Sequence, residues 1–357
     1  MTSITPDNAP VSEVAGGVDT HQDTHTAAVI DGVGRVLGTE QFPATPAGYA
    51  ALLTWMRAFG QLSRVGVEGT GVYGAGLTRL LQAEHIDVIE IDRPSRKTRR
   101  FQGKSDPIDA IAAAKAALAG DRTGIPKQRD GRIEALRALR IARRSAVDQR
   151  ADTQRQIKAL IVTAPDALRQ RLRRLTSTKL IATCAALRPD RDHAADPLTA
   201  TQLALRSLAR RHRQLSAEIA DLDELLDALV TAINPRLSAA HGVGTDTAGQ
   251  LLLTAGENHD RIPSEAAFAM LCGVAPIPAS SGKTTRHRLN RGGDRQANAA
   301  LYRVVLCRLR WDPRTRAYME RRTQDGLSKK EIIRCLKRYV ARELYGLITS
   351  KDQERSA

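Results

Sequence analysis

Short apolar runs alternate with glycine and aspartate over the first ninety residues of the chain. Residues 14–42 hold several such runs and predict two or three β-strands, with the sequence DGVG as the turn between the second and third. After Thr45, which has the side chain of an N-cap residue, the spacing of apolar positions becomes helical. Strand patterns at 64–71 and 86–92 then enclose a second helical pattern at 73–85. Strands that alternate with helices predict an α/β layer.

An alanine-rich helix is predicted to begin just after Ser105. Ser105 takes the N-cap position, Pro107 lies just inside the helix, and Asp106 and Asp109 share one face of its first turn. The helix dipole favours one acidic residue here, which is the simple capping interpretation. Two carboxylates at positions i and i+3 repel each other unless a positive charge lies between them, and a divalent metal ion would supply that charge.

From residue 132 onward the pattern is long, helical and charged. Residues 132–161 and 203–232 contain no Gly or Pro, and they fit the two arms of an extended or antiparallel coiled coil. A less regular segment at 165–197 is expected between the arms. Coiled coils commonly join subunits, so this part of the chain is the candidate oligomerisation segment.

A third unit is expected from about Asn234. The sequence HGVG lies between two short predicted helices, as in a helix-hairpin-helix, and makes Gly242 and Gly244 candidate phosphate contacts. An ordinary glycine-containing helix connection explains the same four residues equally well. A capped helix, an irregular Pro/Ser/Gly loop, a basic strand-like piece, a helix from Asp294 and a basic amphipathic helix at 327–348 follow.

Charge is unevenly distributed along the chain. The 357 residues hold 55 Lys and Arg against 39 Asp and Glu, a net charge of +16. Residues 1–90 contain 4 basic and 10 acidic residues, whereas 129–179 contain 14 and 5, and 283–342 contain 18 and 5. An acidic front joined to a basic remainder is typical of a metal-dependent nuclease unit attached to nucleic-acid-binding segments, with a merely solvated basic face as the alternative.

The N-terminal residues are polar and predict a tail without a signal peptide. No apolar run approaches the ~20 residues that span a bilayer, so no membrane contact is expected. These features predict a cytoplasmic protein.

Four carboxylates form the candidate metal site. Asp19 ends the first predicted strand in GGVDTH, Glu68 ends a later strand in VGVEGTG, and Asp106 and Asp109 open the alanine-rich helix. A carboxylate at the end of an apolar strand is costly unless it is paired or metal-bound. Groups from these three places can meet at one edge of the sheet and hold two Mg²⁺ ions ~4 Å apart. For any single acid a capping or surface role is the simpler interpretation, and only their order is specific.

That order resembles the RuvC-like, RNase H-fold nuclease domain with a DEDD tetrad. The whole chain resembles the DEDD insertion-sequence transposases, which are bridge-RNA-guided recombinases. Five blocks carry the resemblance, in the family's order: GVDTHQDTHTAAV, VEGTGVYGAGLTRLL, KSDPIDAIAAAKAA, HGVGTDTAGQLL and LCGVAPIPASSGKTTRHRLNRGGDRQANAALYRVVL. The resemblance implies that Asp19, Glu68, Asp106 and Asp109 are the catalytic tetrad and bind Mg²⁺, with Asp23 as an alternative to Asp19.

The resemblance also implies a catalytic serine in a Ser-Gly loop, which is GVAPIPASSGK in this chain. Ser281, directly before Gly282, is the expected nucleophile and Ser280 is the alternative register; Val274 stands where the family usually has Leu. Two serines in a flexible basic loop are the plain alternative, because serine is a weak nucleophile without activation. Four cations lie close in sequence and can neutralise a phosphodiester and its transition-state charge: Lys283, Arg286, Arg288 and Arg291.

Together these observations predict a transposase that recombines the DNA of its own insertion sequence through a phosphoserine link. The resemblance implies a structured noncoding RNA that pairs with donor and target DNA. It also implies a homodimer or tetramer in which the nuclease domain of one subunit meets the serine domain of another. Two other interpretations are a junction-resolving nuclease that uses the carboxylates alone and a non-catalytic nucleic-acid-binding protein.

The expected architecture is a RuvC-like α/β domain, a helical coiled-coil segment and a mostly helical C-terminal domain with a helix-hairpin-helix-like element. The expected boundaries are a disordered tail (1–12), the nuclease domain (13–125), the coiled-coil segment (126–232), the serine transposase domain (233–348) and a second tail (349–357).

Overall fold

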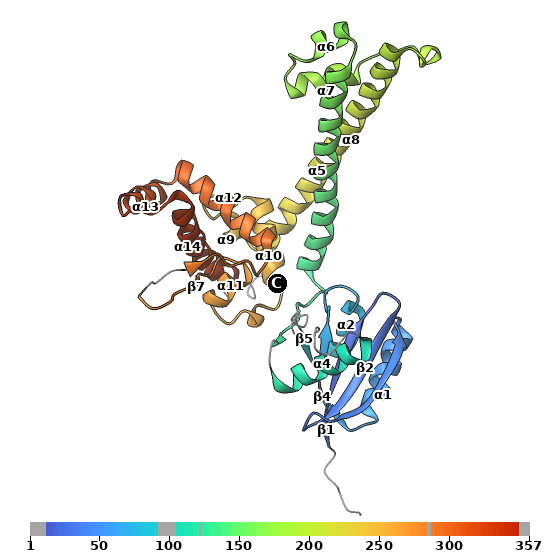
Figure 1. The fold of residues 1–357 in the computed structure, drawn as a ribbon, viewed down its shortest axis with the longest axis vertical. Helices are drawn as coiled ribbons and strands as arrows, with labels where there is room; N and C mark the ends of the chain where they lie inside the picture. Colours follow the sequence, from blue (N-terminus) through green and yellow to red (C-terminus); the bar gives the residue numbers. More distant parts are fainter. Residues whose placement is uncertain (1–11, 92–104, 121–122, 284–286, 350–357) are drawn as a thin grey trace, which may run out of the picture. The chain divides into compact units, whose positions relative to one another are not determined.

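The computed structural model describes residues 12–91, 105–120, 123–283 and 287–349 (Figure 1). The two expected tails lie, apart from residues 12 and 349, outside the described residues. Contacts divide the chain into two compact units, Met1–Arg129 with Gly256–Pro263 and Asp130–Ala255 with Ser264–Ala357. The first unit is mixed α/β and the second is mostly helical, which confirms the predicted fold class at this level.

The first unit is built on a six-stranded sheet in the order β3-β2-β1-β4-β5-β6. β1, β2 and β3 are antiparallel neighbours, β1, β4 and β5 are parallel neighbours, and β6 is antiparallel to β5. Asp31 closes the turn between β2 and β3 by accepting from the N–H groups of Val33 and Arg35, as the DGVG sequence predicts. The strands are Glu13–Thr20 (β1), Thr24–Asp31 (β2), Val36–Pro43 (β3), Gln61–Glu68 (β4), Asp87–Ile91 (β5) and Thr123–Gly124 (β6).

Helices cover both faces of this sheet. α1 (Pro46–Arg57) and α2 (Ala75–Ala83) bury Leu52 and Leu77 with strand residues such as Val18 in one core. α4 (Asp106–Ala119) packs on the other face, where Ala114 meets Ala15. Thr45 caps α1 by accepting from the N–H of Gly48, as predicted. Ser105 takes the N-cap position of α4 through its backbone carbonyl, without a capping bond from its hydroxyl.

Two long helices dominate the second unit, α5 (Arg132–Thr163) and α8 (Pro197–Ile233). They run side by side and antiparallel (Figure 1), since Ile157 shares a core with Leu205 and Arg143 pairs with Asp223. The connection between them is more regular than predicted. It contains α6 (Asp166–Leu172), α7 (Ser177–Ala185) and the 3-10 turn Arg191–His193, because apolar side chains such as Leu180 have a core to pack against.

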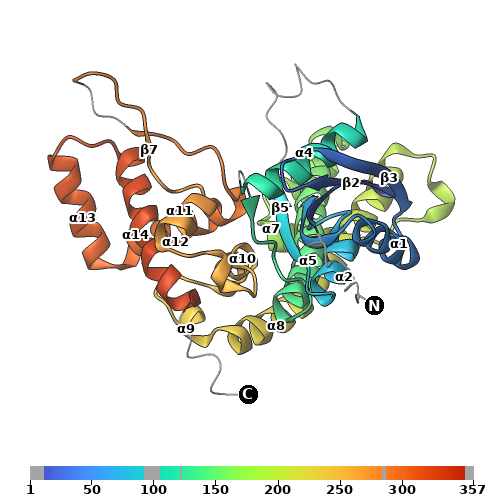
Figure 2. The same cartoon turned by 90° about the horizontal axis from the view of Figure 1, so that it is seen from below.

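The rest of the second unit is a group of helices around α10, α12 and α14 (Figure 2). Ser264 caps α11, the helix predicted to be capped, and α12 begins after the cap Asp294, near its predicted start. No helix is predicted from the sequence at α13, which follows the cap Asp312. A two-stranded hairpin of β7 and β8 interrupts the helices. The elements are α9 (Pro235–Ser238), α10 (Thr245–Ala255), α11 (Glu265–Leu271), β7 (Ile277–Pro278), β8 (His287–Arg288), α12 (Arg295–Trp311), α13 (Pro313–Gln324) and α14 (Lys329–Thr349).

The segment Gly256–Pro263 belongs to the first unit although it lies between α10 and α11 in sequence. The side chain of Asn258 accepts from the N–H of Gln128 at 3.1 Å and donates to the carbonyl of Pro126 at 2.9 Å. Arg261, in the 3-10 turn His259–Arg261, donates to the carbonyl of Ile125 at 3.2 Å. The chain therefore passes between the two units three times, after residues 129, 255 and 263.

Candidate functional site

Two glycines bring α4 into contact with the sheet. Gly17 of β1 and Gly66 of β4 are partners in the parallel ladder. A β-carbon on Gly17 would lie 2.2 Å from backbone atoms of α4, and one on Gly66 would lie 2.5 Å from them. Residues two positions apart on a strand share a face, so Asp19 and Glu68 face α4 as well. Both strand-end carboxylates are thus directed to the helix that carries the other two.

The first turn of α4 completes this group of acids. Asp19 and Asp109 are buried, whereas the side chain of Asp106 is partly exposed. Both α4 carboxylates act electrostatically on Asp19. The structure therefore brings three of the four predicted metal ligands together.

Glu68 lies next to Asp19 on the adjacent strand. Val67 pairs with Val18 in the ladder between β4 and β1, and Glu68 and Asp19 follow directly. The hydroxyl of Thr20 donates to the backbone carbonyl of Glu68 at 2.7 Å and joins the two strand ends. The fourth predicted ligand is thus positioned at the same edge of the sheet.

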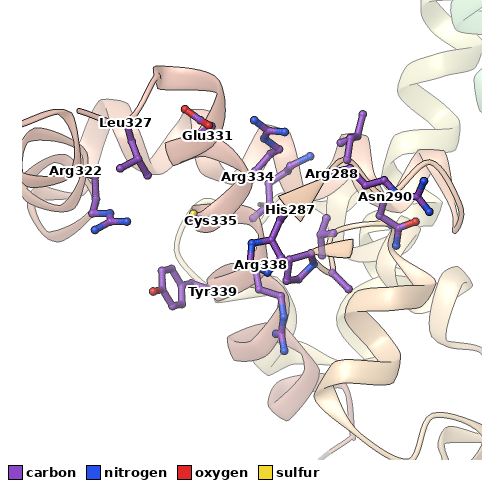
Figure 3. Close-up of a pocket in the computed structure, with 16 residues that line it drawn as sticks. His287, Arg288, Asn290, Arg322, Leu327, Glu331, Arg334, Cys335, Arg338 and Tyr339 are labelled. Carbon is purple, nitrogen blue, oxygen red and sulfur yellow. The ribbon is translucent and has the colours of Figure 1, made fainter. Parts of the chain in front are cut away.

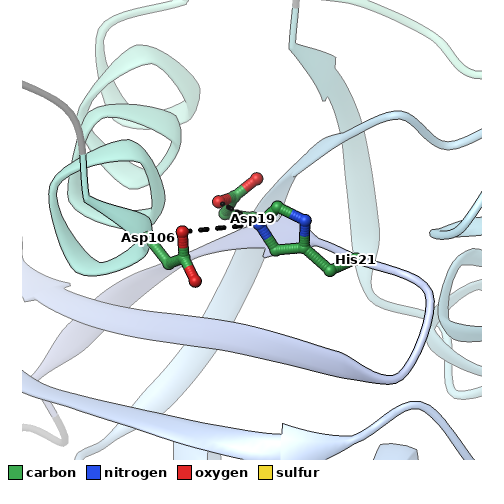
Figure 4. Close-up of side chains that lie close together, drawn as sticks. All are labelled: Asp19, His21 and Asp106. Atoms are coloured by element: carbon green, nitrogen blue, oxygen red, sulfur yellow. Dashed lines mark hydrogen bonds and ion pairs between the residues drawn. The ribbon is translucent and has the colours of Figure 1, made fainter.

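A histidine lies between two of the carboxylates. His21 Nε2 is 3.2 Å from Oδ2 of Asp19 and 3.4 Å from Oδ1 of Asp106 (Figure 4). One ligand atom from each of the three side chains lies within 4.8 Å of the others. Sequence reasoning did not single out His21, although strand alternation was an available signal because it follows Asp19 by two residues. Asp23, the alternative to Asp19, is exposed.

Negative charge is concentrated at this edge of the sheet. Burial raises the pKa of Asp19 above its ordinary value of 3.8, and the Asp109 and Asp106 carboxylates raise it further. His21 opposes the shift through its charge and its hydrogen bond. Partly buried carboxylates at such short range are costly unless a cation compensates them.

The donor set fits a divalent metal ion. Carboxylate oxygens are the preferred ligands of hard cations such as Mg²⁺, Mn²⁺ and Ca²⁺, and an imidazole nitrogen suits several transition metals. The chain offers both, from β1, the turn after it and the start of α4. The site can therefore hold a divalent cation.

The two candidate nucleophiles lie on the hairpin of the second unit. Pro278 pairs with His287 in the hairpin, and Ser281, three residues further along the chain, forms an isolated β-bridge. Ser280 and Ser281 are both exposed. Gly282 has a φ of +55°, a left-handed conformation that favours glycine after the serines. The structure thus places both serines on an exposed glycine turn.

Three of the four basic residues predicted to contact phosphate near this hairpin lie in the described part of the chain. Lys283, Arg288 and Arg291 are exposed, and Arg288 belongs to β8. Arg286 lies outside the described residues. These side chains belong to the second unit, whereas the carboxylates belong to the first.

The sequence HGVG forms the connection between α9 and α10. Gly242 has a φ of +78°, and a β-carbon on it would lie 3.3 Å from the Arg308 side chain of α12. Arg308 also donates to the carbonyl of His241 at 2.9 Å. A β-carbon on Gly244 would meet no atom within 4 Å. One glycine thus has a conformational and packing role, and the other lies in open space.

No helix in the described part of the chain is both long enough and apolar enough to cross a bilayer.

Two transposase family models match the chain. The model for the IS110-type DEDD domain, described as "Transposase", matches residues 16–164 and contains all four carboxylates. The model described as "Transposase IS116/IS110/IS902 family" matches residues 234–320 and contains the serine hairpin. Both halves of the chain thus match one class of protein, the transposases. The chain belongs to the IS110 family of insertion-sequence transposases.

Two insertion-element proteins are similar to this chain. It is 31% identical over 143 residues to the insertion element IS110 uncharacterized 43.6 kDa protein of Streptomyces coelicolor, across 40% of this chain and 35% of that relative. It is 25% identical over 260 residues to the insertion element IS900 uncharacterized 42 kDa protein of Mycobacterium paratuberculosis, across 67% and 65%. The chain thus spans about a third of the first relative's length and just under two thirds of the second's.

Proposed function

We propose that the protein is a transposase that cleaves and rejoins DNA through a covalent serine link, with a metal-dependent carboxylate site in its first unit. The observation that carries this proposal is the meeting of Asp19, Asp106 and Asp109 where α4 packs on Gly17 and Gly66. Close backbone packing holds these negative charges near one another, and a bound divalent cation would compensate their repulsion.

The sheet supports a RuvC-like, RNase H-type assignment for the first unit. Three antiparallel strands are followed by two that run parallel to β1, in the order β3-β2-β1-β4-β5. Asp19 is the penultimate residue of β1 and Glu68 is the last residue of the adjacent β4, and two more acidic residues lie in the first turn of α4. This arrangement presents the carboxylates on one face of one sheet edge, where a DNA phosphate can approach.

Asp19, Asp106 and Asp109 would hold Mg²⁺, with Glu68 beside them. The bound metal supplies charge stabilisation at the phosphate oxygens and at the attacking and leaving oxygens. Gly17 and Gly66 set how far α4 stands from the sheet, and so position the acids. His21 holds Asp19 and Asp106 in contact through one ring nitrogen.

Ser281 is the proposed nucleophile, and Ser280 is the alternative. The Oγ of Ser281 forms a bond to a DNA phosphorus, while the bond from that phosphorus to a sugar oxygen breaks. The sugar oxygen leaves as a hydroxyl group and takes up the proton that the serine loses. Attack by a DNA hydroxyl reverses these bond changes and restores the serine. The exposed Lys283 is placed next to the loop glycine, where it can stabilise the phosphate charge.

The α5–α8 pair is the proposed oligomerisation segment. Ile141 and Leu225 are 57% and 55% exposed, and lie two residues beyond the paired Arg143 and Asp223 on each helix. Because the helices are antiparallel, the two apolar side chains lie at the same level of the pair. Exposed apolar side chains on both helices can pack on a second copy. A structured noncoding RNA is proposed as a further partner from the family resemblance and the basic segments.

Trapping the covalent species tests the proposal. Wild-type protein, Mg²⁺ and labelled DNA containing an element end, with the noncoding RNA added, should yield a protein–DNA adduct that survives denaturation. Ser281→Ala should bind DNA but form no adduct, and Ser280→Ala should retain it. Loss in Ser280→Ala alone would move the nucleophile by one residue.

Two results would contradict the serine mechanism. An adduct that survives removal of both serines would place the nucleophile elsewhere. DNA cleavage without any adduct would favour a junction-resolving nuclease that uses the carboxylates alone.

A further inference from the structure

A pocket of about 730 Å³ lies in the second unit beside the serine hairpin (Figure 3). Its walls come from the turn after α11, from β8, from α13 and the turn after it, and from α14. Part of the wall is apolar and includes Val274, Pro276 and Leu289. A pocket of this size is large enough for a nucleotide-sized group.

Cations dominate the polar part of the wall. The pocket has one acidic side chain in its wall, Glu331. Five basic side chains also line it: Arg288, Arg322, Arg334, Lys337 and Arg338. Arg338 pairs with Glu265 at 2.8 Å, and Arg322 pairs with Asp325 at 2.9 Å. Among the described residues, the structure gives no acidic partner to the other three.

Lys337 is the most unusual of these three cations. Its residue is 8% exposed, and its ammonium group donates to Oδ1 of Asn298 at 2.8 Å. Asn298 donates in turn to the carbonyl of Gly273 at 2.8 Å, which directs its oxygen toward Lys337. The amide is neutral and uses one of three ammonium donors. A buried charge is costly without an opposite charge.

Arg334 increases this cost. It lies one turn earlier on α14 and adds a second positive charge to the same wall. Burial lowers the pKa of Lys337, and the charge of Arg334 lowers it further. An anion in the pocket would balance both side chains.

The pocket shares a wall with the serine hairpin. Pro276 directly precedes β7, and His287 and Arg288 form β8. Ser281 lies five residues after the wall residue Pro276, and five residues span at most about 18 Å. A strand that rests on Lys337 can therefore reach the serine within a few nucleotides.

We propose that this pocket binds a backbone phosphate of the DNA strand that the serine attacks, through Lys337, Arg334 and Arg288. The identity of the strand rests on the proposed function. Free phosphate and a phosphodiester group are both compact anions and would be recognised in the same way. Because the pocket shares a wall with the serine hairpin, the phosphodiester of DNA is the favoured ligand.

The salt dependence of binding tests this pocket. Full-length protein carrying Ser281→Ala, so that no chemistry intervenes, is titrated into a labelled single-stranded oligonucleotide at several salt concentrations. Adding Lys337→Met should lower the slope of log K against log salt by about 0.7, the value for one lost phosphate contact on a single strand. Arg334→Gln should have a similar effect. Lys330→Met is the matched control, because it removes the same charge from α14 outside the pocket.

Several outcomes would overturn the proposal. An equal slope change in Lys337→Met and Lys330→Met would mean a general charge effect, and no change in either pocket variant would exclude a phosphate contact. A change seen only with RNA of the same sequence would assign the pocket to RNA. Competition by inorganic phosphate without any slope change would indicate a free anion.

Folding and chemistry are controlled separately. Thermal unfolding of each variant shows whether it is folded. If Lys337→Met is not folded, Arg334→Gln, which changes an exposed residue, provides the test. A missing adduct in the wild type with an intact slope change would contradict the serine mechanism and leave the phosphate pocket standing.

Discussion

Gly17 meets Ala110 so closely that a β-carbon on the glycine would lie 2.2 Å from the carbonyl oxygen of the alanine. Glycine is the residue that allows a strand and a helix backbone to approach in this way. Asp19 follows on the same face of the strand, and Asp109 precedes Ala110 on the helix. The contact that packs α4 on the sheet is thus also the contact that sets the distance between the carboxylates.

Replacing Gly17 with alanine should therefore affect stability and activity together. The added methyl group forces α4 away from β1, and overpacking of this kind typically costs about 1 to 3 kcal/mol. Chemical denaturation should show the loss of stability, and Mg²⁺-dependent cleavage should fall with it. Gly124→Ala is the matched control, since a β-carbon there meets no atom within 4 Å. Wild-type stability in Gly17→Ala would mean that α4 moves without cost.

Asp109→Asn tests the carboxylate site without changing side-chain volume. Removing one negative charge should weaken Mn²⁺ binding, measured by calorimetry, and abolish strand cleavage. DNA binding without metal should stay close to that of the wild type, because the basic segments lie elsewhere in the sequence. Asp23→Asn removes an exposed carboxylate of the same region and should retain cleavage. Cleavage retained in Asp109→Asn would remove Asp109 from the site, and cleavage lost in Asp23→Asn would include Asp23 in it.

His21→Ala distinguishes a charge-compensating histidine from a metal ligand. Without the ring nitrogen between Asp19 and Asp106, repulsion between the acids is less compensated, so the Tm without metal should fall. Mg²⁺ then relieves more repulsion and should raise the Tm further than it does in the wild type. A smaller Mg²⁺-induced rise would instead identify His21 as a ligand. His193→Ala, which removes an exposed histidine paired with Asp190, is the control.

Acid should weaken the contact between α11 and α14. Arg338, and with it Arg342, lowers the pKa of Glu265 from 4.5 to about 2. A carboxyl whose pKa is depressed by folding stabilises the fold above its unfolded pKa. The contribution is lost as the pH falls from about 4.5 toward 2. Glu265→Gln should therefore be less stable than wild type at pH 7 and converge with it near pH 2 in urea titrations.

The exposed Glu320 of α13 provides the comparison for this pH effect. Glu320→Gln should track the wild type across the same pH range. A pH-independent difference for Glu265→Gln would mean that the ionised pair contributes nothing and that packing alone is lost.

Local patterns predicted the elements of the first unit well. Thr45, the Asp31 turn and the alanine-rich helix all depend on hydrogen bonds and spacings within a few residues, which a sequence displays directly. The tetrad was proposed from strand-end and helix-start acids, and the structure brings Asp19, Asp106 and Asp109 together. Their catalytic role stays a prediction.

Long-range placement was not available from the sequence. His21 contacts Asp106 only because α4 returns to the end of β1, eighty-five residues later. The regular helices in the 165–197 connection depend on a core shared with α5 and α8, and their short apolar patterns do not reveal that core. From the sequence, Lys337 is simply one of the basic residues of an amphipathic helix. Its burial depends on Asn298 of another helix, which accepts a hydrogen bond from its ammonium group.

The return of residues 256–263 to the first unit has a consequence for making chimeric proteins from two relatives. Asn258 and Arg261 supply hydrogen bonds to the backbone of residues 125–128, so the first unit is finished by amino acids encoded far downstream. A chimera that changes parent once, near residue 130, would join one parent's 125–128 segment to the other parent's 256–263 segment. An exchange of the two units between relatives therefore keeps the matched hydrogen bonds only if this short segment is exchanged together with the first unit.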